Sequence, residues 1–139
     1  MNGSHMSIAV GMVLALIVGG AATLFGLDRD RALYPVVMIV IASYYTLFAV
    51  LGGSIEVLII ESAVAAAFLA VALAGFKSTL WLVVIALATH GIFDLVHSHL
   101  YANPGVPVWW PWFCLAYDFV AAAYLAWLLT SKRVPAHAA

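Results

Sequence analysis

The sequence predicts an all-α integral membrane protein, a five-transmembrane-helix bundle with its N-terminus outside and its C-terminus in the cytoplasm. Three observations lead to this fold class. Hydrophobic residues make up 67% of the chain and charged residues 8%, whereas a water-soluble domain carries about 25% charged residues. The apolar residues form five segments, each close to the roughly 20 residues that span a bilayer as a helix. Finally, every Lys and Arg falls on one side of a five-span topology.

Turn-forming and charged residues separate these segments. The charged run Asp28–Arg31 follows the first, and the pair Gly52-Gly53 ends the second. Pro35 opens the second segment, where its missing N–H is harmless. The turn Asn103-Pro104-Gly105 precedes the fifth. The expected spans are Ser7–Leu27, Tyr34–Gly53, Ile55–Phe76, Thr79–Leu100 and Val108–Thr130.

The basic residues set the expected orientation. Arg29 and Arg31 lie in the first loop, Lys77 in the third, and Lys132 and Arg133 after the fifth span. All of these positions share one side of the membrane, which the positive-inside rule makes cytoplasmic. We therefore expect a multi-pass membrane protein of the bacterial inner-membrane type.

Domain organisation and charge narrow the class of protein further. Residues 1–5 read as an expression-tag remnant, 6–133 as one transmembrane helical domain and 134–139 as a short polar tail. The net charge of −1 and the lack of a basic run argue against nucleic acid as a partner. Cys114 is the only cysteine, which excludes an intrachain disulfide.

Ionisable residues of the fourth span form one stripe. His90, Asp94 and His97 are spaced i, i+4 and i+7, so they fall on one helix face in the predicted outer half of the bilayer. HxxxDxxH is a loose pattern, and two interpretations stay open. The stripe either supplies metal ligands or forms a His–Asp–His hydrogen-bond network that holds two helices together.

Other spans place polar residues at similar depth. Cys114 and Asp118 share a face of the fifth span, Glu61 enters from the third, and Tyr44 lies near the middle of the second. A charged carboxylate at mid-membrane costs about 2.5–3.5 kcal/mol. Carboxylates here must therefore turn inward and be protonated, pair with histidine or bind a cation.

These residues predict a metal site and an acid–base site. The expected metal ligands are His90, Asp94, His97 and Asp118, because imidazole and carboxylate suit zinc, iron, copper or manganese. The expected catalytic residues are Glu61, His90, Asp94 and Asp118. The expected cofactor-contacting residues are Tyr44, Trp109, Trp112 and Cys114. The two tryptophans belong to an aromatic cluster that is either an interfacial belt or a lid over the polar site.

Two functions fit these residues. The first is a small membrane enzyme that acts on a lipophilic molecule from the outer-leaflet side by metal-assisted or acid–base chemistry. The second is a non-catalytic binding or accessory subunit whose polar cluster holds a cofactor, an ion or a partner helix. Membrane lipid is an expected partner of either, and a homo-oligomer is compatible with both. The architecture of short spans with inward His, Glu, Asp and Trp is similar to that of the sterol-isomerase and translocator-protein families, and no residue role is carried over from them.

Overall fold

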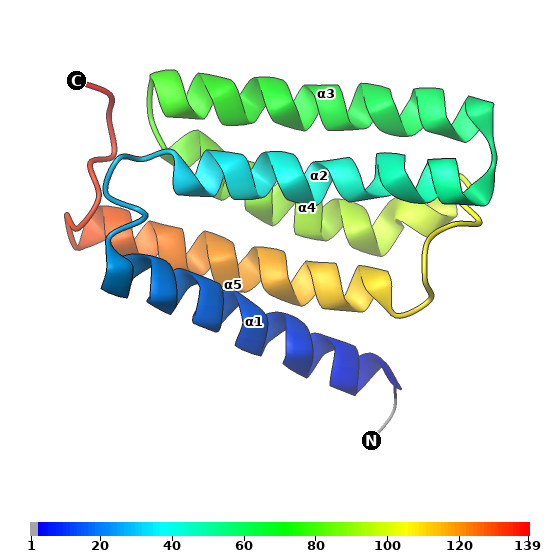
Figure 1. The fold of residues 1–139 in the computed structure, drawn as a ribbon, viewed down its shortest axis with the longest axis horizontal. Helices are drawn as coiled ribbons and strands as arrows, with labels where there is room; N and C mark the ends of the chain where they lie inside the picture. Colours follow the sequence, from blue (N-terminus) through cyan, green and yellow to red (C-terminus); the bar gives the residue numbers. More distant parts are fainter. Residues whose placement is uncertain (1–2) are drawn as a thin grey trace.

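The computed structural model describes residues 3–139 and contains five helices, each long and apolar enough to cross a membrane (Figure 1). They are α1 (Gly3–Phe25), α2 (Leu33–Gly52), α3 (Ile55–Lys77), α4 (Trp81–Leu100) and α5 (Trp110–Thr130). Residues 3–139 contain no β-strand, only an isolated bridge between Thr79 and His137. The all-helical part of the prediction is confirmed, and each expected span overlaps one helix. Membrane insertion and the orientation of the termini stay predictions.

The helices form an elongated bundle with α1 at its periphery. Helix α1 packs on α5, α5 on α4, and α2 on α3, while α4 also contacts α2 and α3. Small residues allow the closest of these approaches. A Cβ atom at Gly11 would overlap the carbonyl oxygen of Phe113 on α5, so only glycine fits where α1 crosses α5.

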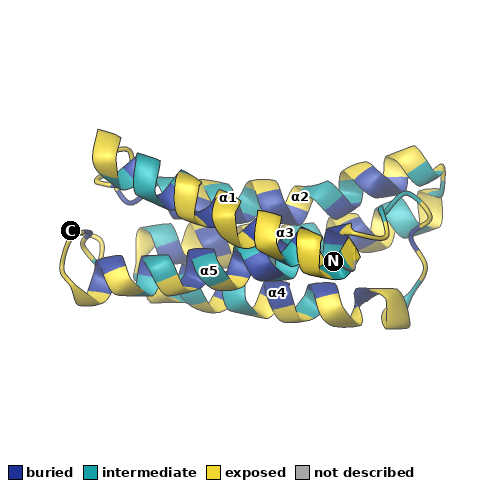
Figure 2. Cartoon of the chain, turned by 90° about the horizontal axis from the view of Figure 1, so that it is seen from below, coloured by how far each residue is buried: buried dark blue, intermediate teal, exposed yellow. Residues whose placement is uncertain are grey.

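Burial is inverted relative to a water-soluble bundle. Large aliphatic and aromatic side chains are exposed on every helix. Figure 2 shows exposed residues, in yellow, along all five helices. At the same time Glu61, His90, Asp94 and Asp118 are no more than 1% exposed. A soluble protein rarely buries such side chains and would cover exposed apolar faces of this extent. The pattern fits helices whose outer faces contact lipid.

The loop between α4 and α5 is fixed against the end of α2. A Cβ atom at Gly105 would overlap the carbonyl oxygen of Phe48, so glycine is needed for this close approach. The Gly105 N–H in turn donates to Oδ1 of Asn103 at 3.2 Å. Helix α2 ends at Gly52, and the capping residue Gly53 adopts a left-handed φ of 71°. This packing holds Asn103 inside the bundle, next to the polar residues described below.

The opposite end of the bundle is closed by Arg31 and the C-terminal residues. The Arg31 guanidinium donates to the carbonyl oxygens of Phe76 at 3.0 Å and Pro135 at 3.3 Å. The Leu80 N–H donates to the Ala136 carbonyl at 2.8 Å, and Val134 is buried. Residues 134–139, expected as a short polar tail, therefore pack against the α3–α4 connection. Arg31 satisfies helix-end carbonyls that would otherwise lack donors.

Candidate functional site

Buried polar side chains from four helices meet in the half of the bundle nearest the α4–α5 loop. Each is at most 2% exposed. They divide into two groups, one around His90 and one around His97. The buried polar residues are Tyr45 on α2, Glu61 on α3, His90, Asp94 and His97 on α4, and Asp118 on α5.

The His90 group joins α4 to α5. His90 Nδ1 lies 2.7 Å from Oδ2 of Asp118 and 3.5 Å from Oδ2 of Asp94. The Cys114 Sγ lies 3.9 Å from Oδ2 of Asp118. One ligand atom from each of these four residues lies within 4.8 Å of the others, so the group could hold a metal ion.

Helix spacing and one glycine bring this group together. His90 and Asp94 are i, i+4 on α4, and Cys114 and Asp118 are i, i+4 on α5, so each pair shares a face. A Cβ atom at Gly91 would lie 3.3 Å from the Asp118 Cβ. Glycine at position 91 therefore lets the backbone of α4 come close to Asp118.

Two carboxylate oxygens in the His90 group lack hydrogen-bond donors. Within residues 3–139, Oδ2 of Asp94 and Oδ1 of Asp118 are buried without a hydrogen-bond partner. Leaving a buried polar atom unsatisfied costs about 1–3 kcal/mol, and more if the atom is charged. These oxygens therefore need a proton, a water molecule or a cation.

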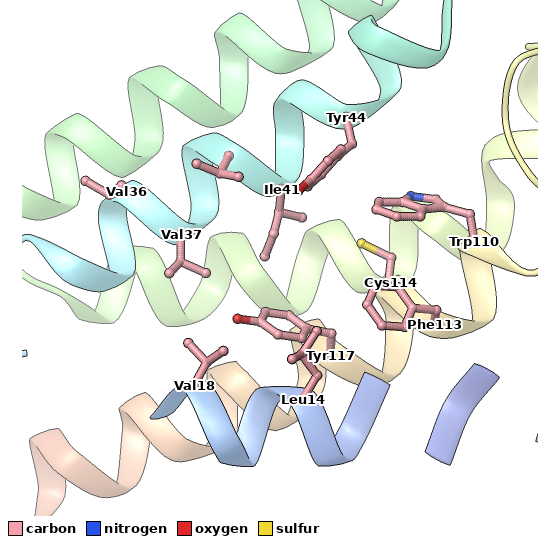
Figure 3. Close-up of a pocket in the computed structure, with 11 residues that line it drawn as sticks. Leu14, Val18, Val36, Val37, Ile41, Tyr44, Trp110, Phe113, Cys114 and Tyr117 are labelled. Atoms are coloured by element: carbon pink, nitrogen blue, oxygen red, sulfur yellow. The ribbon is translucent and has the colours of Figure 1, made fainter. Parts of the chain in front are cut away.

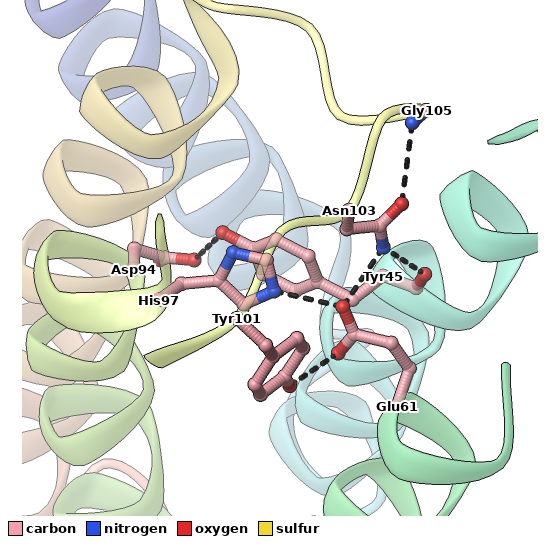
Figure 4. A network of polar contacts seen from close by, with 7 residues as sticks. All are labelled: Tyr45, Glu61, Asp94, His97, Tyr101, Asn103 and Gly105. Carbon is pink, nitrogen blue, oxygen red and sulfur yellow. Dashed lines mark hydrogen bonds and ion pairs between the residues drawn. The ribbon is translucent and has the colours of Figure 1, made fainter. Parts of the chain in front are cut away.

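The His97 group, in contrast, is fully bonded around Glu61 (Figure 4). His97 Nε2 lies 2.7 Å from Oε1 of Glu61, which also accepts from Nδ2 of Asn103 at 2.8 Å. The Tyr101 hydroxyl donates to Oε2 at 2.9 Å. Tyr101 lies beyond the end of α4, and burial, together with the neighbouring Glu61 carboxylate, raises the pKa of its hydroxyl. Both oxygens of Glu61 are therefore engaged, and the Tyr101 proton is held on the phenol.

Tyr45 connects the two groups. Its hydroxyl donates to Oδ1 of Asp94 at 2.6 Å. Its ring stacks on the His97 imidazole, with ring centroids 4.2 Å apart and planes inclined by 26°. The Tyr45 carbonyl accepts from Asn103 Nδ2 at 3.2 Å. One residue of α2 thus holds Asp94 in place and supports the His97 ring.

Two pockets border the polar residues. An apolar pocket of about 300 Å³ lies between α1, α2 and α5, and its wall includes Tyr44, Trp110 and Cys114 (Figure 3). A second pocket, of about 600 Å³, lies beside the α4–α5 loop and is bordered by Asp94 and Trp112, among others. The apolar pocket borders the polar residues at Cys114, and the second pocket borders them at Asp94 and His97.

The structure separates the residues that the sequence assigned to one metal site. His90, Asp94 and Asp118 lie together, and Cys114 joins them, whereas His97 pairs with Glu61 instead. Because the fourth-span stripe extends over two helical turns, its two histidines meet carboxylates from different helices.

The residues expected to contact a cofactor lie in different surroundings. Tyr44 and Cys114 line the apolar pocket, and Trp112 borders the second pocket. Trp109 is 51% exposed. Trp110, which the sequence analysis did not single out, is the buried tryptophan of this cluster.

From the sequence, one hydroxyl of the neighbouring Tyr44 and Tyr45 is expected to turn inward, with Tyr44 chosen for the site; the structure shows that Tyr45 is the buried one that bonds Asp94. Asn103 was not expected in the site. A signal for Tyr45 was present, because Met38, Ile41, Tyr45 and Phe48 recur at helical spacing and share the buried face of α2. For Asn103 the sequence predicts only a position in a turn. Its contact with Glu61 depends on how the loop packs, which helical periodicity does not report.

No protein-family model, curated protein or solved structure matches this chain. The fold and the site therefore define the class: a five-helix bundle of membrane type with a buried His/Asp/Cys group.

Proposed function

We propose that this protein is a multi-pass membrane enzyme that acts on a lipophilic substrate, with one divalent metal ion bound by His90, Asp94, Cys114 and Asp118. The observation that carries the proposal is the pair of unsatisfied oxygens on Asp94 and Asp118, buried beside an imidazole and a thiol. Buried polar groups in folded proteins are almost always satisfied. A cation would satisfy both oxygens at once.

Charge favours a metal over an empty site. Asp94 and Asp118 carry more negative charge when ionised than the single imidazole of His90 can neutralise, and all three residues are buried. Zinc is the ion that we expect, because imidazole nitrogen, thiolate sulfur and carboxylate oxygen are all among its usual ligands. Iron, copper and manganese are the other outcomes of an elemental analysis.

The residues of the His90 group also suit acid–base chemistry. A carboxylate 2.7 Å from an imidazole nitrogen fixes the orientation of the ring and supports a positive charge on it. Glu61 contributes to catalysis less directly in this arrangement, because His97, Asn103 and Tyr101 occupy both of its oxygens. In a metal-free form of the site, proton transfer would fall to His90 and Asp118; with a metal bound, both serve as ligands. In either form the adjoining pockets would position the substrate.

Elemental analysis of the detergent-purified protein tests this proposal. We expect about one equivalent of metal per chain in the unmodified protein and in the His99→Ala control, because His99 is exposed. The His90→Ala variant should contain no bound metal. A metal-free preparation that gains no thermal stability from added zinc, iron, copper or manganese would contradict the metal site.

A second candidate function is a non-catalytic binding or accessory subunit. It is favoured by the near-complete burial of His90, Asp94, Cys114 and Asp118, each at most 2% exposed. Such a site can hold an ion without admitting a substrate. Retention of metal with no turnover of any lipophilic compound that binds the pocket would support this alternative.

The proposed location is a bacterial-type inner membrane, with the C-terminus in the cytoplasm. The placement of every Lys and Arg in the α1–α2 loop, at the end of α3 or after α5 supports this orientation. A C-terminal reporter that is active in the cytoplasm and silent in the periplasm is the expected result. The reverse pattern would overturn the topology.

A further inference from the structure

We propose that the apolar pocket between α1, α2 and α5 binds one neutral lipophile, a hydrocarbon body with a single uncharged oxygen-bearing end, such as a long-chain alcohol, ester or ketone. This inference rests on the proposed function and names the substrate class of the same site.

Three helices form the walls of the pocket. Leu14 and Val18 come from α1, Ile41 and Tyr44 from α2, and Cys114 from α5 (Figure 3). Because α1 packs mainly on α5, it leaves a space on the side that faces α2. The volume of about 300 Å³ is at the lower end of the range for small-molecule sites. It suits a single slender molecule.

The lining has no charged side chain. All its residues are aliphatic or aromatic except Cys114. A phosphate, carboxylate or ammonium group placed among them would lose its hydration without gaining a partner of opposite charge. The lining therefore selects an uncharged ligand over a phospholipid headgroup or an ionised fatty acid.

The lining does offer hydrogen-bond donors. The indole N–H of Trp110 is buried and has no partner among the described residues. Tyr44 and Tyr117 add hydroxyl groups. Figure 3 shows the Tyr117 ring between α1 and α2, and the Tyr44 ring packs against Trp110. Unused donors favour a ligand with an acceptor oxygen over a plain hydrocarbon.

Cys114 joins this pocket to the candidate metal centre. Its side chain lines the pocket, and its Sγ lies 3.9 Å from Oδ2 of Asp118. A ligand whose oxygen reaches the Cys114 end therefore has that oxygen beside the His90 group. The hydrocarbon body then extends along the aliphatic side chains of α1 and α2.

Photo-cross-linking in lipid nanodiscs tests the site. One sample receives a long-chain alcohol that carries a diazirine, and a parallel sample receives a phosphatidylcholine that carries the same group. We expect saturable labelling of α2 and α5 pocket residues by the alcohol, competed by unlabelled alcohol. The phospholipid should label exposed helix faces without saturation. Equal, non-saturable labelling by both probes would mean ordinary membrane lipid only and would overturn the proposal.

A matched pair of α1 variants sharpens the test. Leu14 lines the pocket, whereas Leu16 does not, and both are exposed. Leu14→Trp should abolish the saturable labelling, and Leu16→Trp should leave it unchanged. Retained labelling in Leu14→Trp would contradict binding in this pocket.

The donor groups have their own test. Tyr44 packs against Trp110 near Cys114, and Tyr44→Phe should weaken competition by the unlabelled alcohol roughly two- to tenfold, the worth of one hydrogen bond. Competition by an alkane of equal length should not change. Equal effects on both competitors would contradict recognition of the oxygen.

Metal content of the same preparations separates the two proposals. Saturable labelling of a protein that contains no metal would support the pocket proposal and contradict the metal proposal. One equivalent of metal without saturable labelling would contradict the pocket proposal only.

Discussion

The two histidine–carboxylate pairs have the same length and different surroundings. His90 lies 2.7 Å from Asp118, and His97 lies 2.7 Å from Glu61. Around Glu61 both oxygens are hydrogen-bonded, whereas Asp118 retains a buried oxygen without a partner. The histidine–carboxylate distance therefore does not distinguish a pair that supports the fold from one that could bind a ligand. The carboxylate oxygens without hydrogen-bond partners distinguish the two pairs.

The difference arises from the α4–α5 loop. Tyr101 and Asn103 come from this loop and supply neutral donors to Glu61. The His90 group lies farther along α4 from that loop, and Tyr45 donates only to the Oδ1 atom of Asp94. A helix interior offers few free donors, because the backbone N–H groups are already bonded within the helix.

The strongest test of this comparison removes a carboxylate from the His90 group. Asp118→Asn removes one carboxylate from the proposed ligands, so metal affinity should fall at least about 10–100-fold, the loss typical of even outer-shell residues. Affinity is measured by competition with a metal chelator. Glu61→Gln is the matched control and should keep the affinity of the unmodified protein. Loss of metal from the control alone would reverse the assignment of the two groups.

The second test concerns stability rather than metal. Glu61→Ala leaves His97, Tyr101 and Asn103 without their acceptor, so the free energy of unfolding should fall by about 3–5 kcal/mol. Glu61→Gln should cost much less, because its carbonyl can still accept from His97 and Asn103 and its amide can donate to the Tyr101 hydroxyl. Unfolding by SDS in mixed micelles measures both. Equal losses would argue that the charge itself, rather than acceptor geometry, stabilises this group.

The third test addresses the connection between the groups. Tyr45→Phe removes the hydrogen bond to Asp94, and metal affinity should drop by about 10–100-fold because that bond orients a ligand. Tyr44→Phe, one residue earlier on the pocket side, should leave the affinity unchanged. An unaltered affinity in Tyr45→Phe would mean that Asp94 is not a ligand.

The smallest expected effect is that of Asn103→Ala. The change removes donors to Glu61 and to the Tyr45 carbonyl, and stability should fall by about 1–3 kcal/mol. Thermal unfolding in detergent measures the loss, and metal content should not change. Loss of metal in this variant would show that the loop supports the His90 group as well.

Periodicity and hydropathy predicted the five helices and the face that carries the polar stripe. Helix spacing also predicted that Asp118 lies near His90, and their side chains are 2.7 Å apart in the structure. It did not report which carboxylate each histidine meets, because that depends on the rotation of α3 and α5 against α4. Asn103 illustrates what the sequence could not predict. Its role follows from the close packing of Gly105 on α2, a contact between residues far apart in the chain.

The order of synthesis gives Arg31 two successive roles. The chain makes Arg31 before it makes any of the carbonyls that the guanidinium binds, those of Phe76 and Pro135 among them. In the proposed topology, Arg31 lies on the cytoplasmic side of the membrane, where a cation favours that orientation before those residues emerge. In the folded chain the same side chain is buried in the bundle, where it is 9% exposed. Closure of this end therefore needs residues that are made after the fifth helix.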